Sequence, residues 1–280
     1  MMIKELKTDY PVKVICETLG IARSTYYWVH LPKPGDKELL DAIEKIIMKR
    51  PTYGYRRITH ELKRKGHIVG ETRVRRLLKH LEHSCSVGKA SISTTNSQHG
   101  HPRYPNLIKR LHISHLNQVW VADITYIRLG RKFIYLAIIL DAFSRGVRGW
   151  ELGHSLDKYL TISALEKALA AYPAPEIHHS DQGAQYATPA YTSLLSNTTR
   201  ISMSNVGCPT ENGIAERFIR TFKEEHIDYT EYKNFADAVE QIAYWMEVDY
   251  MTERIHSALE YMTPLEFEVL QIELFEPRTP

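Results

Sequence analysis

An aspartate stands in the middle of an otherwise apolar stretch, Val119–Ile127, with the sequence VWVADITYI. Its β-branched and aromatic residues predict a buried strand. A carboxylate inside such a strand is costly unless it pairs with a cation or binds a metal. Asp123 therefore constrains the fold, because the chain has to bring suitable partners to this one buried position.

Two further acids stand in segments that a fold can bring to Asp123. The segment Ile177–Tyr186, IHHSDQGAQY, predicts a short buried strand that ends on Asp181 and continues into a polar turn. The segment Ser202–Phe218 predicts a strand end, a Gly/Pro loop and the start of a helix that carries Glu216. Three carboxylates from two strands and a helix suit a hard divalent metal ion, which prefers oxygen ligands.

Each of these acids also has a purely structural alternative. Asp123 would then pair with an arginine, and Glu216 would be a surface acid of its helix. Asp181 would cap the turn at Gly183. The other acids that compete for a place in the site are Glu211, Glu224 and Glu225.

The helix around Glu216 carries two more candidate side chains on one face. Asn212 lies one turn before Glu216 and Lys223 two turns after it, so all three project in one direction. Gln185 and Tyr186, which follow Asp181, are expected at the rim of the same site.

Positive charge is concentrated in one part of the chain. The net charge is only +3, but residues 49–110 hold fifteen Lys or Arg against three Asp or Glu, an excess of twelve. Apolar periodicity predicts helices at 36–50, 56–65 and 71–83, and the last is strongly basic. A helix, a turn and a basic helix are typical of helix-turn-helix DNA binding, and the alternative is a solvated basic face. The candidate DNA contacts are Arg56, Arg57, Arg73, Arg75, Arg76 and Lys79.

The remaining chain divides into recognisable segments. We expect a small helix-turn-helix at 1–33, a basic helical DNA-binding domain at 34–84 and a flexible linker at 85–114. A mixed α/β catalytic domain is expected at 115–232, with strands at 119–127, 133–140, 147–152, 177–181 and 200–203. A helical extension that packs on this domain is expected at 233–280.

The segments WVADITYI (120–127), HSDQGAQY (179–186), SMS (202–204) and ENGIAERF (211–218), with Lys223, resemble the catalytic core of DDE transposases and retroviral-type integrases. They most resemble OrfB, the larger reading-frame product of circle-forming bacterial insertion sequences. Two departures are the 34 residues between Asp181 and Glu216, one fewer than the family's usual interval, and Glu211, where Asp is more common. The resemblance implies a ribonuclease-H-like α/β core behind an N-terminal helical helix-turn-helix region.

The resemblance also implies the chemistry. Two Mg²⁺ ions, for which Mn²⁺ would substitute, would be held by Asp123, Asp181 and Glu216, with Asp123 shared between them. The enzyme would cut one strand at an element end and transfer the 3′ hydroxyl, giving element circles and then integration. Lys223 would contact the DNA end, and Asn212 would orient Glu216 or DNA. Without metal, the three carboxylates are expected to raise one another's pKa.

Expected partners are double-stranded DNA, both the terminal inverted repeats of the element and the target, and at least one further copy of the chain. An upstream partner frame, OrfA, is a further expected partner, because this chain resembles the downstream frame alone. Three widely spaced cysteines and the lack of any apolar run long enough to span a bilayer favour the bacterial cytoplasm, at the nucleoid, without membrane contact. The rival functions are a catalytically idle DNA-binding regulator and a structure-specific nuclease that cuts without joining.

Overall fold

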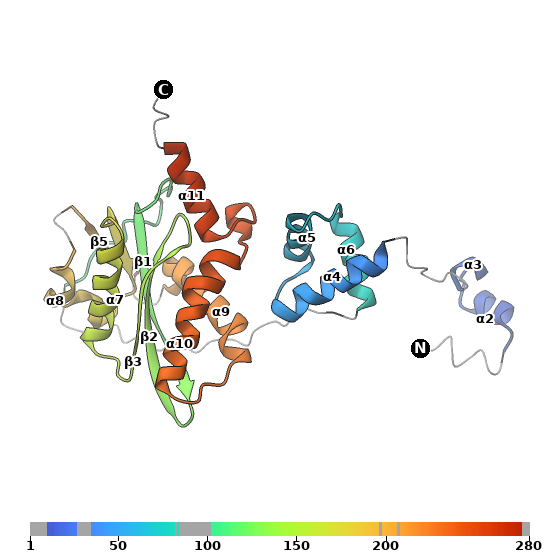
Figure 1. Cartoon of the computed structure of the whole chain (residues 1–280), viewed down its shortest axis with the longest axis horizontal. Helices are drawn as coiled ribbons and strands as arrows, with labels where there is room; N and C mark the ends of the chain where they lie inside the picture. Colours follow the sequence, from blue (N-terminus) through green and yellow to red (C-terminus); the bar gives the residue numbers. More distant parts are fainter. Residues whose placement is uncertain are drawn as a thin grey trace.

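The structure is a computed structural model that describes residues 10–26, 35–81, 83, 102–195, 198–205 and 208–275. Its centre is a five-stranded sheet with helices on both faces (Figure 1). The strands are β1 Val119–Leu129, β2 Lys132–Asp141, β3 Val147–Gly153, β4 Ile177–Ser180 and β5 Arg200–Met203.

The sheet has the order β3-β2-β1-β4-β5. The first three strands form an antiparallel meander, and β4 and β5 then add in parallel beside β1. This topology confirms the ribonuclease-H-like core that the sequence resemblance implied. It places β1 at the centre of the sheet, so Asp123 pairs with Ile138 of β2 on one side and lies just past the end of the β4 pairing on the other.

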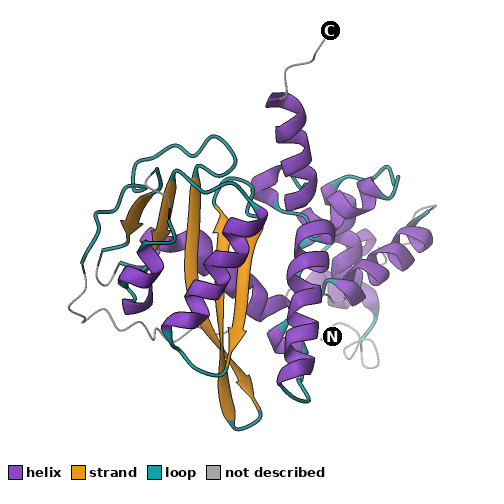
Figure 2. Cartoon of the chain, turned by 60° about the vertical axis from the view of Figure 1, so that its left-hand side comes forward, coloured by secondary structure: helices purple, strands orange, loops and turns teal. Residues whose placement is uncertain are grey.

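Two helical layers cover the sheet, as Figure 2 shows. On one face lie α7 Lys158–Ala171 and α8 Pro189–Thr192, packed against alternate residues of β1 such as Trp120 and Ala122. On the other face lie α9 Gly213–Glu225 and α10 Phe235–Tyr244, which pack over Val119 and Val121. Side chains of a strand alternate between faces, so β1 contributes to both cores. Short 3₁₀ turns complete the core at Ala184–Ala187, Pro209–Asn212, Ile227–Tyr229 and Ser257–Leu259.

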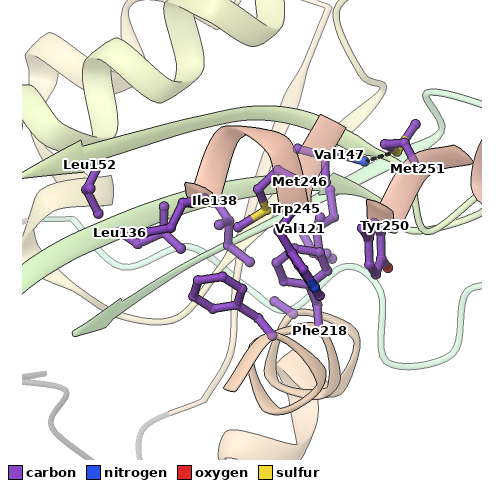
Figure 3. Packing of buried hydrophobic residues seen from close by; sticks show 14 of the residues in the cluster. Val121, Leu136, Ile138, Val147, Leu152, Phe218, Trp245, Met246, Tyr250 and Met251 are labelled. Carbon is purple, nitrogen blue, oxygen red and sulfur yellow. Dashed lines mark hydrogen bonds between the residues drawn. The ribbon is translucent and has the colours of Figure 1, made fainter. Parts of the chain in front are cut away.

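The C-terminal extension is part of the core. After α10 the helix widens into the π-helical segment η4, Trp245–Glu253, in which Arg254 donates its backbone N–H to the carbonyl of Asp249. Trp245, Met246 and Tyr250 lie beside Phe218 and Val121 under the sheet (Figure 3). The predicted packing of this extension on the core is therefore observed. Its last helix is α11, Pro264–Phe275.

Two helical units precede the core. The first is α2 Val12–Thr18 with α3 Arg23–Tyr26, close to the predicted first helix-turn-helix. The second comprises α4 Asp36–Lys49, α5 Tyr55–Arg64 and α6 Glu71–His80, which share a separate hydrophobic core. Gly66 ends α5 in a left-handed turn with φ +85°, a conformation that glycine adopts without steric cost.

The second helical unit is joined to the C-terminal extension rather than to the sheet (Figure 1). Ile255 is fully buried in its hydrophobic core, and the backbone N–H of Ile255 donates to the hydroxyl of Tyr53 at 3.1 Å. Arg50, 8% exposed in its side chain, forms an ion pair with Asp249. These contacts fix the basic helices beside the α9 side of the core.

The predicted linker, 85–114, falls largely outside the described residues. Its described part, 102–114, lies against the core: Leu107, Ile108, Leu111 and Ile113 pack on the hydrophobic cluster. The backbone N–H of Leu107 also donates to the hydroxyl of Ser202 at 2.9 Å. This segment is therefore tied to β5 before β1 begins. In the part of the chain that the structure describes, no helix has both the length and the apolarity to cross a membrane.

Candidate active site

Asp123 and Asp181 stand next to each other on parallel strands. The register of β1 and β4 pairs Val119 with Ile177 and ends with Ala122 opposite Ser180. The residue after this last pair is Asp123 on one side and Asp181 on the other. Neighbouring strands lie about 4.8 Å apart. The two carboxylates therefore leave the sheet from adjacent positions, at the point where β4 ends.

Glu216 approaches the pair from the helical layer. Asp123 lies on the same face of β1 as Val119 and Val121, which α9 covers. Burial, with smaller contributions from the negative charges of Asp181 and Glu216, raises the pKa of Asp123 to about 8. The expected effect of neighbouring carboxylates is thus found at Asp123, whereas the raised pKa of Glu216 comes from burial.

Asn212 fixes the start of α9 to β1. Its side-chain nitrogen donates to the backbone carbonyl of Ala122 at 3.0 Å, and the side chain is only 4% exposed. The bond holds the residue just before Asp123, so this geometry favours the orienting role over direct contact with DNA. Its amide oxygen has no hydrogen-bond partner among the described residues.

The turn after Asp181 is tightly packed. Asp181 Oδ1 accepts from the backbone N–H of Gly183 at 2.9 Å, so the turn-capping alternative is also realised. A Cβ added at Gly183 would lie 2.9 Å from that oxygen and 3.2 Å from Oε1 of Gln185. Only glycine fits there without displacing the carboxylate. A carboxylate has two oxygens, so capping through one is compatible with a metal ligand role.

Tyr186 lies deeper than the rim position predicted for it. The side chain is 2% exposed, and its hydroxyl has no hydrogen-bond partner among the described residues. Burial raises its pKa, with smaller contributions from Tyr191 and from the charges of Asp181 and Asp123. Tyr186 is therefore a buried residue near the acidic pair, whereas Gln185 is partly exposed.

Lys223 lies close to the same acids. Its ammonium stands 4.8 Å from the centroid of the Tyr126 ring. Burial lowers the pKa of Lys223, and the charge of Asp123 counteracts this shift. Tyr126 was not among the predicted site residues, because side chains three apart on a strand point to opposite faces and its spacing from Asp123 gives no signal.

The structure binds two of the three rival acids, Glu211 and Glu225, in other contacts. Glu211 accepts from the backbone of Asn205 and from the side chain of Asn106, which together with Lys109 hold its pKa down to about 2. Glu225 is tied to Arg254 by two bonds of 2.7 Å. For Asp123, no lysine or arginine of the described chain lies within ion-pair distance, so the arginine-paired alternative is not observed.

The donor set fits a hard divalent cation in its chemistry, because it offers three carboxylates and no soft ligand. The positions of these side chains do not by themselves form a complete metal site. Within the residues described, no three His, Cys, Asp or Glu side chains are grouped closely enough to hold one metal ion. Each aspartate instead uses one oxygen in a local bond, Asp123 to the N–H of Ile124 and Asp181 to that of Gly183.

The six predicted DNA contacts of the helical unit divide into two sets. Arg73 and Arg76 bind the fully buried carboxylate of Asp36 at 2.8 and 2.6 Å, a structural role that the sequence did not reveal. Arg57 lies 3.6 Å from Glu225 and over the ring of Tyr53. The exposed members are Arg56, Arg75 and Lys79.

Comparisons with known proteins agree with this geometry. A family model described as "Integrase core domain" matches residues 114–209, a second with that description matches 197–264, and an "HTH-like domain" matches 34–88. The "Insertion element IS600 uncharacterized 31 kDa protein" of Shigella sonnei is 36% identical over 264 residues, 90% of this chain and 97% of that protein. The "Transposase for insertion sequence element IS904" of Lactococcus lactis is 33% identical over 220 residues, 77% of this chain and 87% of that protein.

The chain belongs to the insertion-sequence transposases. This transposase is a polynucleotidyl transferase with an integrase core and an HTH-like DNA-binding domain, and DNA is its partner. The solved "HTLV-2 integrase catalytic core domain in complex with magnesium (trimeric form)" is 18% identical, with a TM-score of 0.43 over 54% of this chain and 96% of that chain.

Proposed function

We propose that the transposase cuts one strand at an end of its own insertion sequence and transfers the new 3′ hydroxyl to a phosphate beside the other end. In the cut, water breaks a phosphodiester and leaves a 3′ hydroxyl on one strand end and a 5′ phosphate on the other. In the transfer, a new phosphodiester forms as another breaks and its 3′ oxygen leaves as a hydroxyl, so this step needs no external energy source. The products are element circles, which the same chemistry then integrates into target DNA. The observation that carries this proposal is the adjacency of Asp123 and Asp181 under a helix that supplies Glu216.

In this proposal Asp123, Asp181 and Glu216 would hold two Mg²⁺ ions, for which Mn²⁺ would substitute. Bound there, the metal would activate the attacking hydroxyl and stabilise the leaving oxygen. The residues of the chain do the rest. Asn212 keeps the backbone at Ala122 in place, and this positions Asp123.

Lys223 and the exposed rim contact DNA in this account. Lys223 directs a positive charge toward the acids from α9 and would contact a phosphate of the element end near the scissile bond. Gln185 would contact the strand at the mouth of the site. Arg56, Arg75 and Lys79 would hold the duplex through its phosphates, and Arg57, Arg73 and Arg76 would support them from within the fold.

Bringing two element ends together requires at least a dimer. An upstream partner frame, OrfA, would supply further recognition of the ends. The work would take place in the bacterial cytoplasm at the nucleoid. The dimer follows from the proposed reaction, because one active site cannot hold two ends for joining without a second copy nearby.

The test is a strand-joining assay with the full chain, Mg²⁺ and a labelled duplex carrying a candidate element end. The proposal predicts joined products with wild type and none with Asp181→Asn. Nicking without joining would favour a structure-specific nuclease instead. Tight binding without any chemistry, even after addition of the partner frame, would favour the idle regulator.

A further inference from the structure

A cavity of about 400 Å³ lies on the neighbouring face of α9, away from Glu216. It is formed where three parts of the chain meet: α5 of the helical unit, the β2–β3 turn with the start of α9, and the segment after η4. Figure 1 shows the helical unit on this side of the core. Of the described residues that line the cavity, none is an Asp or Glu, and four are the arginines Arg57, Arg145, Arg217 and Arg254.

The positive charge of the cavity is only partly neutralised. Glu225, outside the lining, pairs with Arg254 at 2.7 Å and lies 3.6 Å from Arg57. Arg145 and Arg217 have no ion-pair partner within the described residues. Asp141 is a second acid, and its charge acts on Arg145 from outside ion-pair distance. Two carboxylates therefore stand against four guanidinium groups, and the cavity keeps an excess of positive charge.

The burial of these groups shifts the pKa of several of them. Burial lowers the pKa of Arg145, and it lowers the pKa of Arg57 together with the charges of Arg254 and Arg217. His256, which lines the same cavity, has its pKa lowered to about 2 by burial and by the neighbouring arginines. A bound anion would oppose these shifts, because a nearby negative charge raises the pKa of Arg57, Arg145 and His256.

The backbone at Arg145 gives a second, independent reason to expect an anion in the cavity. Arg145 has φ +63°, a left-handed conformation that costs a residue with a side chain about 1 kcal/mol. Its carbonyl accepts from the hydroxyl of Tyr250 at 3.0 Å, which holds this turn against the C-terminal segment. Glycine or asparagine would be easier there, so the turn is built at a conformational cost that keeps a guanidinium at the cavity.

The position of the cavity indicates which anion it takes. Arg217 and Thr221 line it from α9, the helix that carries Glu216 to the acids, and Arg57 follows the exposed Arg56 on α5. We propose that the cavity is a phosphate-binding site that takes a backbone phosphate of the DNA that the helical unit and the core hold together. The proposal rests on the function proposed above, and it adds a phosphate contact between the two units.

The test compares full-length wild type with Arg145→Gln and Arg217→Gln in binding a labelled duplex at several salt concentrations. Arg131→Gln is the matched control, because Arg131 is exposed at the other end of β2 and loses the same charge. Each cavity variant should bind about tenfold more weakly and lower the slope of log Kd against log salt by about one. The control should match wild type, and thermal melts should show that Arg217→Gln, an exposed position, remains folded.

A parallel arm separates a DNA phosphate from a free anion. Thermal melts of the same proteins are compared in inorganic phosphate and in chloride at equal ionic strength. Unchanged salt slopes in both variants, with wild-type DNA binding intact, would overturn the proposal. If phosphate then stabilised wild type but not the variants, the cavity would be a site for free phosphate. Strand joining by wild type in that case would leave the proposed function standing, whereas failure of wild type to bind DNA would remove both.

Discussion

Asp123 and Asp181 are the first residues after the last paired position, Ala122 opposite Ser180, of two neighbouring parallel strands. They are neighbours because the sheet places β4 directly beside β1, although the two strands are separated by β2, β3 and α7 in the chain. Burial and this neighbour keep the pKa of Asp123 near 8. The relationship has measurable consequences for stability as well as for catalysis.

The first consequence is a pH dependence that Asp123→Asn removes. A carboxyl group with a raised folded-state pKa stabilises the fold fully below its unfolded pKa near 4, and this contribution is lost as the pH rises through about 8. In EDTA, wild type should therefore lose about 1–3 kcal/mol relative to Asp123→Asn between pH 5 and 8. Urea unfolding at each pH measures the difference, and parallel pH curves for the two proteins would contradict it.

Asn212→Ala tests the bond that holds β1 in place at the site. Loss of the amide leaves the Ala122 carbonyl without this donor and frees the backbone beside Asp123. Strand joining should fall about 10- to 100-fold, as for other residues that orient a ligand set, while DNA affinity stays within twofold of wild type. Asn234→Ala is the control, because Asn234 caps α10 through one side-chain bond to Asp237 away from the acids. Equal activity in the two variants would exclude the positioning role.

Asp36→Ala should destabilise the helical unit by about 2–4 kcal/mol, since it leaves two arginines without their buried partner. The loss of stability stays within this range because Arg73 and Arg76 are partly exposed and water can solvate them. Lys37→Ala, a change at an exposed neighbour, should have little effect. Chemical unfolding of both variants provides the comparison, and a loss below 1 kcal/mol for Asp36→Ala would show that the pair is not structural.

The contact between Arg50 and Asp249 couples the helical unit to the core. Asp249→Ala leaves the largely buried guanidinium of Arg50 without its main carboxylate, at a cost of about 3 kcal/mol. We expect thermal unfolding to separate into two transitions, with the helical unit melting first. Glu231→Ala, a change at an exposed acid between the Ile227–Tyr229 turn and α10, serves as the control. One cooperative transition at an unchanged temperature would contradict the coupling.

Local pattern was enough to predict most elements of this fold. The apolar runs of β1, β2 and β3 and the amphipathic faces of α4 and α6 lie within a few residues of their expected positions. Asp123 was predicted because an acid in an apolar strand is costly and therefore informative. Asp181 and Glu216 were predicted from a strand end and a helix face, and the shared role of the three acids stays a prediction.

Long-range contacts were not predictable from those patterns. The helical extension expected at 233–280 widens into a π-helical segment at Trp245, a change in hydrogen bonding that apolar periodicity does not encode. The pairing of Arg50 with Asp249, 199 residues apart, leaves no local signal. Arg73 and Arg76 were predicted to contact DNA for a similar reason. In the sequence their buried partner, Asp36, looks like an ordinary acid in the first turn of a helix.

The most direct test of the central claim is Mn²⁺ binding followed by electron paramagnetic resonance, on the full chain with a bound duplex. If Asp123, Asp181 and Glu216 hold the catalytic ions, wild type should bind Mn²⁺, and Asp181→Asn should lose at least tenfold in affinity. Glu211→Gln, a change at an acid bound elsewhere, should bind as wild type does. Equal Mn²⁺ affinity in wild type and Asp181→Asn would contradict the account.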